Sequence, residues 1–170
     1  MFEIVKLFFK ICLLKKAPQD IPYSAWLFRI TVAINSFISF LVIYISTGWW
    51  YALQQVFIGV ILIITITWII LLLASKTTRF YQTATALFGT DAIINFFAIP
   101  ALATIATQHA TEISNLILLG LMIWHWLVSG HIFRHALSTN LLFGLGVSLL
   151  YIIISNWVMV ALFPQIIEVR

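Results

Sequence analysis

Five apolar stretches dominate the sequence, and each is long enough to cross a lipid bilayer. A membrane-spanning helix needs about 20 consecutive, mostly apolar residues. Hydrophobic residues make up 63% of the 170 residues and charged residues 8%, whereas a soluble domain has about 25% charged residues. We therefore expect an all-α polytopic membrane bundle that forms one domain over residues 1–170. The expected spans are residues 25–46, 51–74, 80–105, 113–133 and 141–163.

The third stretch contains Pro100, which cannot donate a hydrogen bond to the carbonyl of Phe96. The helix should therefore kink or end there, and a neighbouring helix must cover the freed carbonyl because lipid cannot. A four-span alternative follows, in which residues 101–115 lie on the outer surface. Small residues at depth would allow close helix approach. These are Gly89, Gly120, Gly144 and Gly146, with Ser148 four residues after Gly144.

Residues 1–16 have charged side chains at helical spacing, unlike the five long stretches. Glu3, Lys6 and Lys10 fall on one narrow face, since residues in a helix are separated by about 100°. This pattern predicts an interfacial amphipathic helix with its apolar side in lipid and its lysines toward anionic headgroups. A helix that docks on a partner is the alternative. The single cysteine, Cys12, is expected to be a small apolar residue of this segment.

Positive charge is concentrated between particular stretches. Five spans with the N-terminus inside place seven cations on the cytoplasmic side, opposite Arg170, Glu112 and Glu168. This distribution follows the positive-inside rule. It also argues against nucleic acid as a partner, because the cations are not gathered on one soluble surface. The seven are Lys6, Lys10, Lys15, Lys16, Lys76, Arg79 and Arg134.

Asp91 lies eleven residues into the third stretch, or about 16 Å from the inner boundary. A charged carboxylate there costs several kcal/mol unless it is protonated, paired or hydrated. His125 lies at a similar depth on the next, antiparallel stretch, so we expect Asp91 to bond His125 or a nearby amide. Asn95 and Asn35 are the amides at mid-depth. We call Asp91, His125, Asn95 and Asn35 the intramembrane cluster.

Two interpretations of the intramembrane cluster stay open. It can fix how the helices pack, at about 0.6–2 kcal/mol per bond in a membrane. It can also belong to a proton or ion path, because acids within membranes mark such routes. A relay needs titratable groups from one face to the other, and beyond Asp91 the outer half offers only Asn156 and Ser155. The pattern therefore favours packing over full transport.

A second polar group closes the fourth stretch, where His131, Arg134 and His135 lie within five residues. His131 and His135 share a helix face, but His125 is more than two turns deeper, so one metal cannot bind all three. We expect neither a metal nor haem. The favoured interpretation is an interfacial cap, stabilised by the helix dipole and anionic lipid. Asp20 either caps the first span, as Ser24 also could, or pairs with Arg134.

Three segments together resemble a family of short, uncharacterised proteobacterial inner-membrane proteins: APQDIPYSAW (17–26), RFYQTATALFGTDA (79–92) and GHIFRHAL (130–137). The topology is also similar to that of Yip1-type proteins, with five spans and a cytoplasmic N-terminus. The resemblance implies a bacterial inner membrane, a periplasmic C-terminus and no established activity. Family members lack an acid at Asp91, which makes Gln82, His131, Arg134 and His135 the better candidates. We call Asp20, Gln82, His131, Arg134 and His135 the rim cluster.

No catalytic pattern is present, since GxSxG, paired intramembrane aspartates and a phosphate-binding glycine loop are all missing from the sequence. We therefore expect a non-enzymatic inner-membrane protein that acts by association, as a scaffold, assembly factor or accessory subunit. Its expected partners are the bilayer, anionic headgroups, and another membrane protein or a second copy of itself. The alternative is a small transporter or proton-coupled channel that uses Asp91 and His125.

Overall fold

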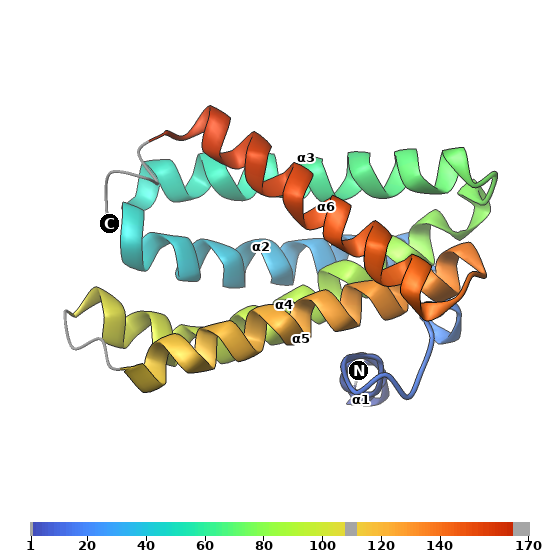
Figure 1. Cartoon of the computed structure of the whole chain (residues 1–170), viewed down its shortest axis with the longest axis horizontal. Helices are drawn as coiled ribbons and strands as arrows, with labels where there is room; N and C mark the ends of the chain where they lie inside the picture. Colours follow the sequence, from blue (N-terminus) through green and yellow to red (C-terminus); the bar gives the residue numbers. More distant parts are fainter. Residues whose placement is uncertain (1, 108–111, 165–170) are drawn as a thin grey trace.

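The computed structural model describes residues 2–107 and 112–164, and within them every regular element is helical. Five of these helices are long and apolar enough to cross a membrane, which makes the protein a multi-pass membrane protein (Figure 1). These five helices begin and end within four residues of the expected span boundaries. The elements are α1 (Phe2–Cys12), α2 (Ala25–Thr47), α3 (Trp49–Leu73), α4 (Phe80–Ala106), α5 (Glu112–Leu137) and α6 (Leu141–Leu162). His109, Glu168 and Arg170 lie outside the described residues.

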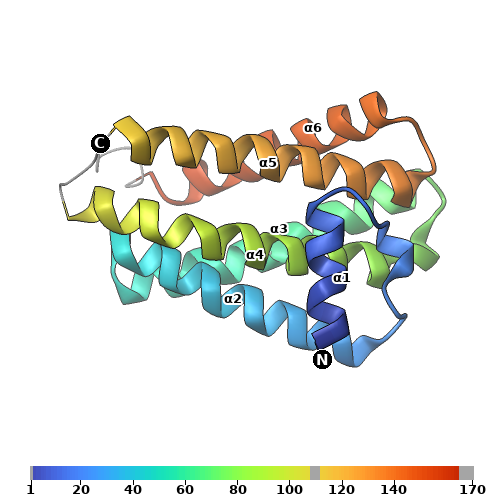
Figure 2. The same cartoon turned by 90° about the horizontal axis from the view of Figure 1, so that it is seen from below.

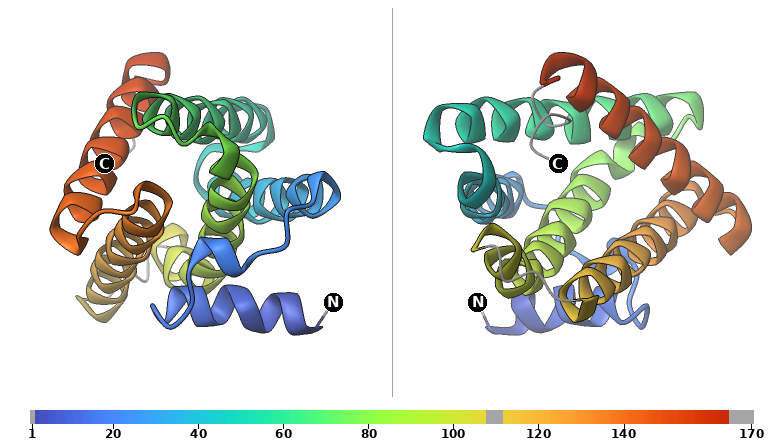
Figure 3. Two further views of the ribbon diagram at one scale, coloured as in Figure 1. Left: turned by 90° about the vertical axis from the view of Figure 1, so that its right-hand side faces the viewer. Right: turned by 60° about the vertical axis from the view of Figure 1, so that its left-hand side comes forward.

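The central helix is α4, which packs against α1, α2, α3 and α5. Seen along the bundle, α4 lies in the middle while the other helices surround it (Figure 3). It continues past Pro100 to Ala106, so the proline does not end it. The four-span alternative is therefore wrong, because residues 101–106 and 112–115 belong to the long helices α4 and α5. Contacts with these neighbouring helices hold α4 in its central position.

Local sequence signals set the helix ends. Ser24 caps α2, where its hydroxyl accepts a hydrogen bond of 3.3 Å from the Leu27 N–H. Asp20 and Ser24 were both candidate caps of this helix, and Ser24 is the one that caps it. Asn140 caps α6 in the same way, accepting from the Phe143 N–H at 2.8 Å. Gly48 joins α2 to α3 with a φ of +82°, a conformation that glycine adopts without steric cost.

Helix α1 lies across the bundle instead of parallel to it (Figure 2). It ends at Cys12, short of the residue 16 expected from the sequence. Phe8, Ile11 and Cys12 are buried in the same core cluster as residues of α4 and α5. The expectation that this apolar face lies in lipid is therefore wrong for these three side chains, which the bundle covers, whereas Phe9 stays 40% exposed. Helix α1 is part of the fold.

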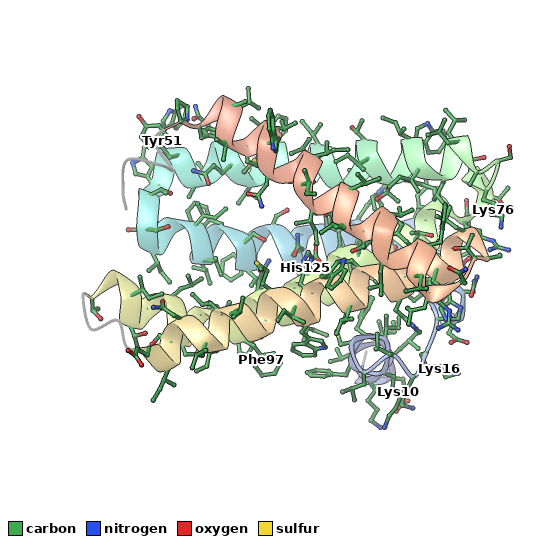
Figure 4. The ribbon with its side chains drawn as sticks, in the orientation of Figure 1. Lys10, Lys16, Tyr51, Lys76, Phe97 and His125 are labelled. Carbon is green, nitrogen blue, oxygen red and sulfur yellow. The ribbon has the colours of Figure 1, made fainter. Side chains whose placement is uncertain are left out.

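The charged side of α1 faces away from the bundle, as predicted. Glu3, Lys6 and Lys10 are exposed, and the Lys6 ammonium lies 3.0 Å from the Glu3 carboxylate. The Lys10 side chain points outward in Figure 4. Long lysine stems let the charged group reach water while the stem lies along apolar surface. This explains how a helix with three charged residues can lie beside apolar spans.

The glycines of the spanning helices divide into two groups. Gly89, Gly130 and Gly144 are in close contact with their neighbours. An added Cβ would collide with Phe8 at Gly89, with Leu145 at Gly130 and with the α5 backbone at Gly144. In the same α5–α6 interface the Ser148 hydroxyl donates to the Trp126 carbonyl at 3.2 Å. The expectation of close approach is confirmed for Gly89 and Gly144. It is wrong within this chain for Gly120 and Gly146, where an added Cβ would meet nothing within 4 Å.

Candidate functional site

The polar side chains that the sequence analysis singled out occupy two levels of the bundle. Lys16 and Lys76 lie at one end, Tyr51 lies at the other, and His125 lies about midway (Figure 4). We call the end with Lys16 and Lys76 the basic end. The intramembrane cluster belongs to the middle level and the rim cluster to the basic end.

In the middle level, α4 and α5 are joined by a hydrogen bond between Asp91 and His125. The His125 Nε2 lies 3.0 Å from an Asp91 carboxylate oxygen. The Asp91 side chain is 11% exposed and the His125 side chain 27% exposed, so the bond is largely shielded from its surroundings. The predicted pairing is confirmed. A carboxylate beside an imidazole can hold a proton or pass it between them.

The two amides of the intramembrane cluster do not join this pair. The Asn95 amide donates to the Ser39 hydroxyl at 3.3 Å, which ties α4 to α2. Asn35 is also buried on α2, and its carbonyl oxygen has no hydrogen-bond partner among the described residues. Asp91 and Asn95 therefore make two separate contacts of α4, one with α5 and one with α2.

The C-terminal end of α1 lies beside the Asp91–His125 pair. The indole N–H of Trp124, the neighbour of His125, donates to the Cys12 carbonyl at 2.9 Å. Burial, and secondarily the negative charge of Asp91, raises the pKa of the Cys12 thiol to about 12. A thiol with such a pKa is protonated at neutral pH and is a poor nucleophile or metal ligand. Cys12 is therefore a packing residue, as the sequence suggested.

At the basic end, the rim cluster holds the segment between α1 and α2 against the bundle. His131 of α5 is 6% exposed, and its Nε2 lies 3.0 Å from the Lys16 carbonyl oxygen. The Gln82 amide of α4 donates to the Ile21 carbonyl at 2.8 Å and to the Gln19 carbonyl at 3.2 Å. The Gln19 amide in turn donates to the His135 carbonyl at 2.7 Å. Gln82 and His131 thus position the segment.

The expected pairing of Asp20 with Arg134 is wrong. Asp20 accepts a bond of 2.9 Å from the Ala17 N–H and one of 3.5 Å from the Lys16 ammonium. The Ala17 bond is the main cause of the lowered pKa of Asp20. Arg134 takes part in none of the hydrogen bonds or ion pairs found among the described residues. The Asp20 carboxylate is satisfied by a hydrogen bond within its own turn, so it needs no distant cation.

His131 and His135 share a helix face as predicted, and their rings pack edge to face with centroids 4.6 Å apart. His131 is enclosed by protein, so the expectation that it faces lipid headgroups is wrong. Within the described residues, no three side chains of the His, Cys, Asp and Glu types gather closely enough to hold a metal ion.

Sequence reasoning missed the residues that complete the end of α5. The Arg79 guanidinium donates to the His135 and Ala136 carbonyls at 3.2 and 3.0 Å, and to the Ser138 hydroxyl at 2.7 Å. The Lys76 ammonium donates to the Leu137 carbonyl. Two cations thus satisfy carbonyls that have no partner within the helix. Their position in the turn before α4, level with the end of antiparallel α5, was the available signal.

Arg29 is a further cation that the sequence analysis did not assign to either side of the membrane. It lies in the second turn of α2 with an exposed side chain. It makes no hydrogen bond or ion pair with any residue that the structure describes. A cation within an apolar span is costly unless it finds an anion or reaches water.

Comparisons with known protein families, with curated proteins and with solved structures found no match. The resemblance to the proteobacterial family therefore stays a prediction. The function has to be argued from the geometry described above.

Proposed function

We propose that the protein acts by association, as a scaffold, assembly factor or accessory subunit of a membrane complex in a bacterial inner membrane. The observation that carries this proposal is the open space at Gly59, Gly120 and Gly146. A glycine within a helix costs about 0.5–1 kcal/mol relative to alanine. No contact with the described residues offsets that cost at these positions, but a closely packed helix of another chain would.

The hydrogen bonds of the polar side chains also support a role in association over a role in catalysis. At the basic end, Gln19, Gln82 and Arg79 all bond main-chain carbonyls of the same chain. In the middle level, Asp91 and His125 bond each other. These groups hold the fold together, and they are not arranged around a place where a substrate atom could react.

The orientation belongs to the same proposal. The positive-inside rule places the basic end, and with it the N-terminus, in the cytoplasm. The C-terminus then lies in the periplasm. Lys10 and Lys15, which are exposed, face anionic lipid headgroups in this orientation.

Crosslinking in native membranes, followed by purification in mild detergent, tests the association. The substitutions Gly120→Leu and Gly146→Leu fill the open spaces and should abolish the crosslinked complex. Ala161→Leu, at an exposed position of α6, adds similar bulk and should leave the complex intact. If the unaltered chain runs alone after crosslinking, or if all three variants keep the same partner, the proposal is wrong.

A second candidate function is a small transporter or proton-coupled channel. It is favoured by the 3.0 Å contact between Asp91 and His125 in the middle of the spans. Reconstituted flux that is lost in Asp91→Asn would support this function. Flux equal to that of the unaltered protein would remove it.

A further inference from the structure

An apolar groove of about 630 Å³ lies between α1, α2 and α4. This volume falls within the range of about 300–1,000 Å³ that is typical of small-molecule sites. Its walls include Val5 and Phe9 of α1, Trp26 and Ile30 of α2, and Ile93 and Phe96 of α4. Of the polar contacts described above, only the Ser24 cap of α2 lies in its lining.

The groove continues along α2 beyond α1. A second hollow of about 490 Å³ shares Ile34, Ile38 and Phe96 with the first and extends to Leu41 and Ile99. From the level of Arg29 to Leu41 the helix rises about 18 Å, which is more than half of the roughly 30 Å hydrocarbon core of a bilayer. The shape suits a long, narrow occupant that enters near the basic end.

The lining offers almost nothing to a polar occupant. Its two hydroxyl side chains are already used, since Ser24 caps α2 and Thr31 donates to the Leu27 carbonyl at 2.6 Å. A hydrocarbon chain is therefore the occupant that fits, because any polar group placed there would lose its hydrogen bonds.

Helix α1 makes the groove a walled site instead of an open bundle surface. The Phe8 ring occupies the space above Gly89, where a Cβ would lie 2.3 Å from the ring. The Phe9 and Phe97 rings pack edge to face, with centroids 6.5 Å apart. These two contacts hold the wall in place over α4.

A cation lies on α2 at the level of the basic end of the groove, although its side chain is not part of the lining. Arg29 is three residues after Trp26 and directly before Ile30, two lining residues of α2. Residues three apart are neighbours on a helix surface. Lys6 on α1 already pairs with Glu3, whereas Arg29 has no partner among the described residues. A guanidinium binds a phosphate through two parallel hydrogen bonds.

We propose that this groove binds one acyl chain of an anionic phospholipid, whose phosphate is held by Arg29. The headgroup lies toward the basic end and the chain runs between α2 and α4 toward Leu41. This lipid site is separate from the open glycines, so it stands independently of the proposed partner association. A transmembrane helix of another protein is the competing occupant.

Native mass spectrometry of the full chain tests the proposal after reconstitution in vesicles of phosphatidylglycerol and phosphatidylcholine in equal amounts. The unaltered protein should keep one phosphatidylglycerol molecule when the detergent micelle is removed. Ile34→Trp fills the groove and should abolish retention of either lipid. Arg29→Gln should keep a bound lipid but reduce the preference for phosphatidylglycerol by about tenfold or more, because one charge-assisted contact is lost.

Matched variants separate the site from general surface effects. Ile34 is 48% exposed and Ile153 on α6 is 45% exposed, so Ile153→Trp adds the same bulk and should leave retention unchanged. Lys15→Gln removes an exposed cation of the segment between α1 and α2 and should leave the preference unchanged. Protection of Cys12 from alkylation reports that each variant is folded. Equal retention of both lipids, no retained lipid, or a protein partner displaced by Ile34→Trp would overturn the proposal.

Discussion

Asp91 and His125 lie among apolar helices, and each supplies the other's hydrogen bond across 3.0 Å. Because lipid offers no replacement partner, the removal of one side chain leaves the other unsatisfied. The same holds for Asn95, one turn further along α4, and Ser39 of α2. These pairs determine the rotation of α4 about its own axis, since a turned helix would lose both contacts.

At the residue scale, we predict that Asp91 and His125 are energetically coupled. A double-mutant cycle of Asp91→Ala and His125→Ala should give a coupling free energy of about 0.6–2 kcal/mol. Unfolding in detergent measures it. Asn115→Ala, at an exposed position of α5, should change stability by less than about 0.5 kcal/mol. Strictly additive single substitutions would show that the bond contributes nothing.

The sequence predicted the Asp91–His125 bond because depth along a helix can be counted at about 1.5 Å per residue. It did not predict that Asn95 bonds Ser39, nor that Asp20 stays within its own turn. Depth says nothing about the direction in which a side chain points around the helix axis. That direction is set by packing against neighbours, and the sequence alone does not contain it.

At the scale of the element, α1 combines a charged outer side with an inner side that fits the bundle. An apolar helix face has the same pattern whether lipid or protein covers it, so the sequence could only identify the helix. Phe8 at Gly89 and Trp124 at the Cys12 carbonyl distinguish the two cases. Both contacts join residues more than 80 positions apart.

Cys12 should report whether α1 is docked. With its pKa raised to about 12, roughly one thiol in 10,000 is ionised at pH 8, so alkylation of the folded protein should be slow. The rate should keep rising with pH past the ordinary thiol value of 9.0, because the thiolate fraction grows until the raised pKa is reached.

Phe8→Ala should speed this alkylation several-fold by loosening α1, whereas Leu13→Ala, at a 57% exposed position, should not. A maleimide assay by mass spectrometry gives both rates. Wild-type Cys12 that reacts as fast as in the unfolded chain would contradict the docked position of α1.

The C-terminal end of α5 gives a second prediction at this scale. Arg79→Ala removes the donor to two carbonyls and one hydroxyl and should destabilise the protein by about 1–3 kcal/mol. Arg134→Ala keeps the Cβ that packs near Gly144 and should cost clearly less. Thermal unfolding of the two variants in the same detergent compares them. An equal loss of stability would mean that the contacts of Arg79 are not the main stabilising ones.

At the scale of the whole molecule, the turn before α4 and the turn after α5 lie at the same end, joined by Arg79 and Ser138. The loop at Gly48 belongs to the opposite end, since the single spanning helix α3 separates it from the turn before α4. The five spans could be predicted from the sequence because a bilayer demands uninterrupted apolar length. The sequence could not predict which helix occupies the centre of the bundle. Helix α3 is more apolar than α4, and yet α4 is the more buried of the two.

Side-specific labelling of single cysteines checks this arrangement. In a Cys12→Ala background, Thr78→Cys and Thr139→Cys, both at exposed positions, should react with an impermeant maleimide from the cytoplasmic side. Ser46→Cys, also exposed, should react from the periplasmic side. Labelling of Thr78→Cys and Thr139→Cys from different sides would invalidate the five-span arrangement.

The position of α1 has a consequence for how the protein is made. Trp124, which bonds the Cys12 carbonyl, lies 112 residues later in the chain. At a synthesis rate of about 5–20 residues per second, Cys12 is added to the chain roughly 6–22 s before Trp124. During this interval the apolar side of α1 has no α5 surface to pack against. The first helix to be translated is therefore among the last to reach its final position.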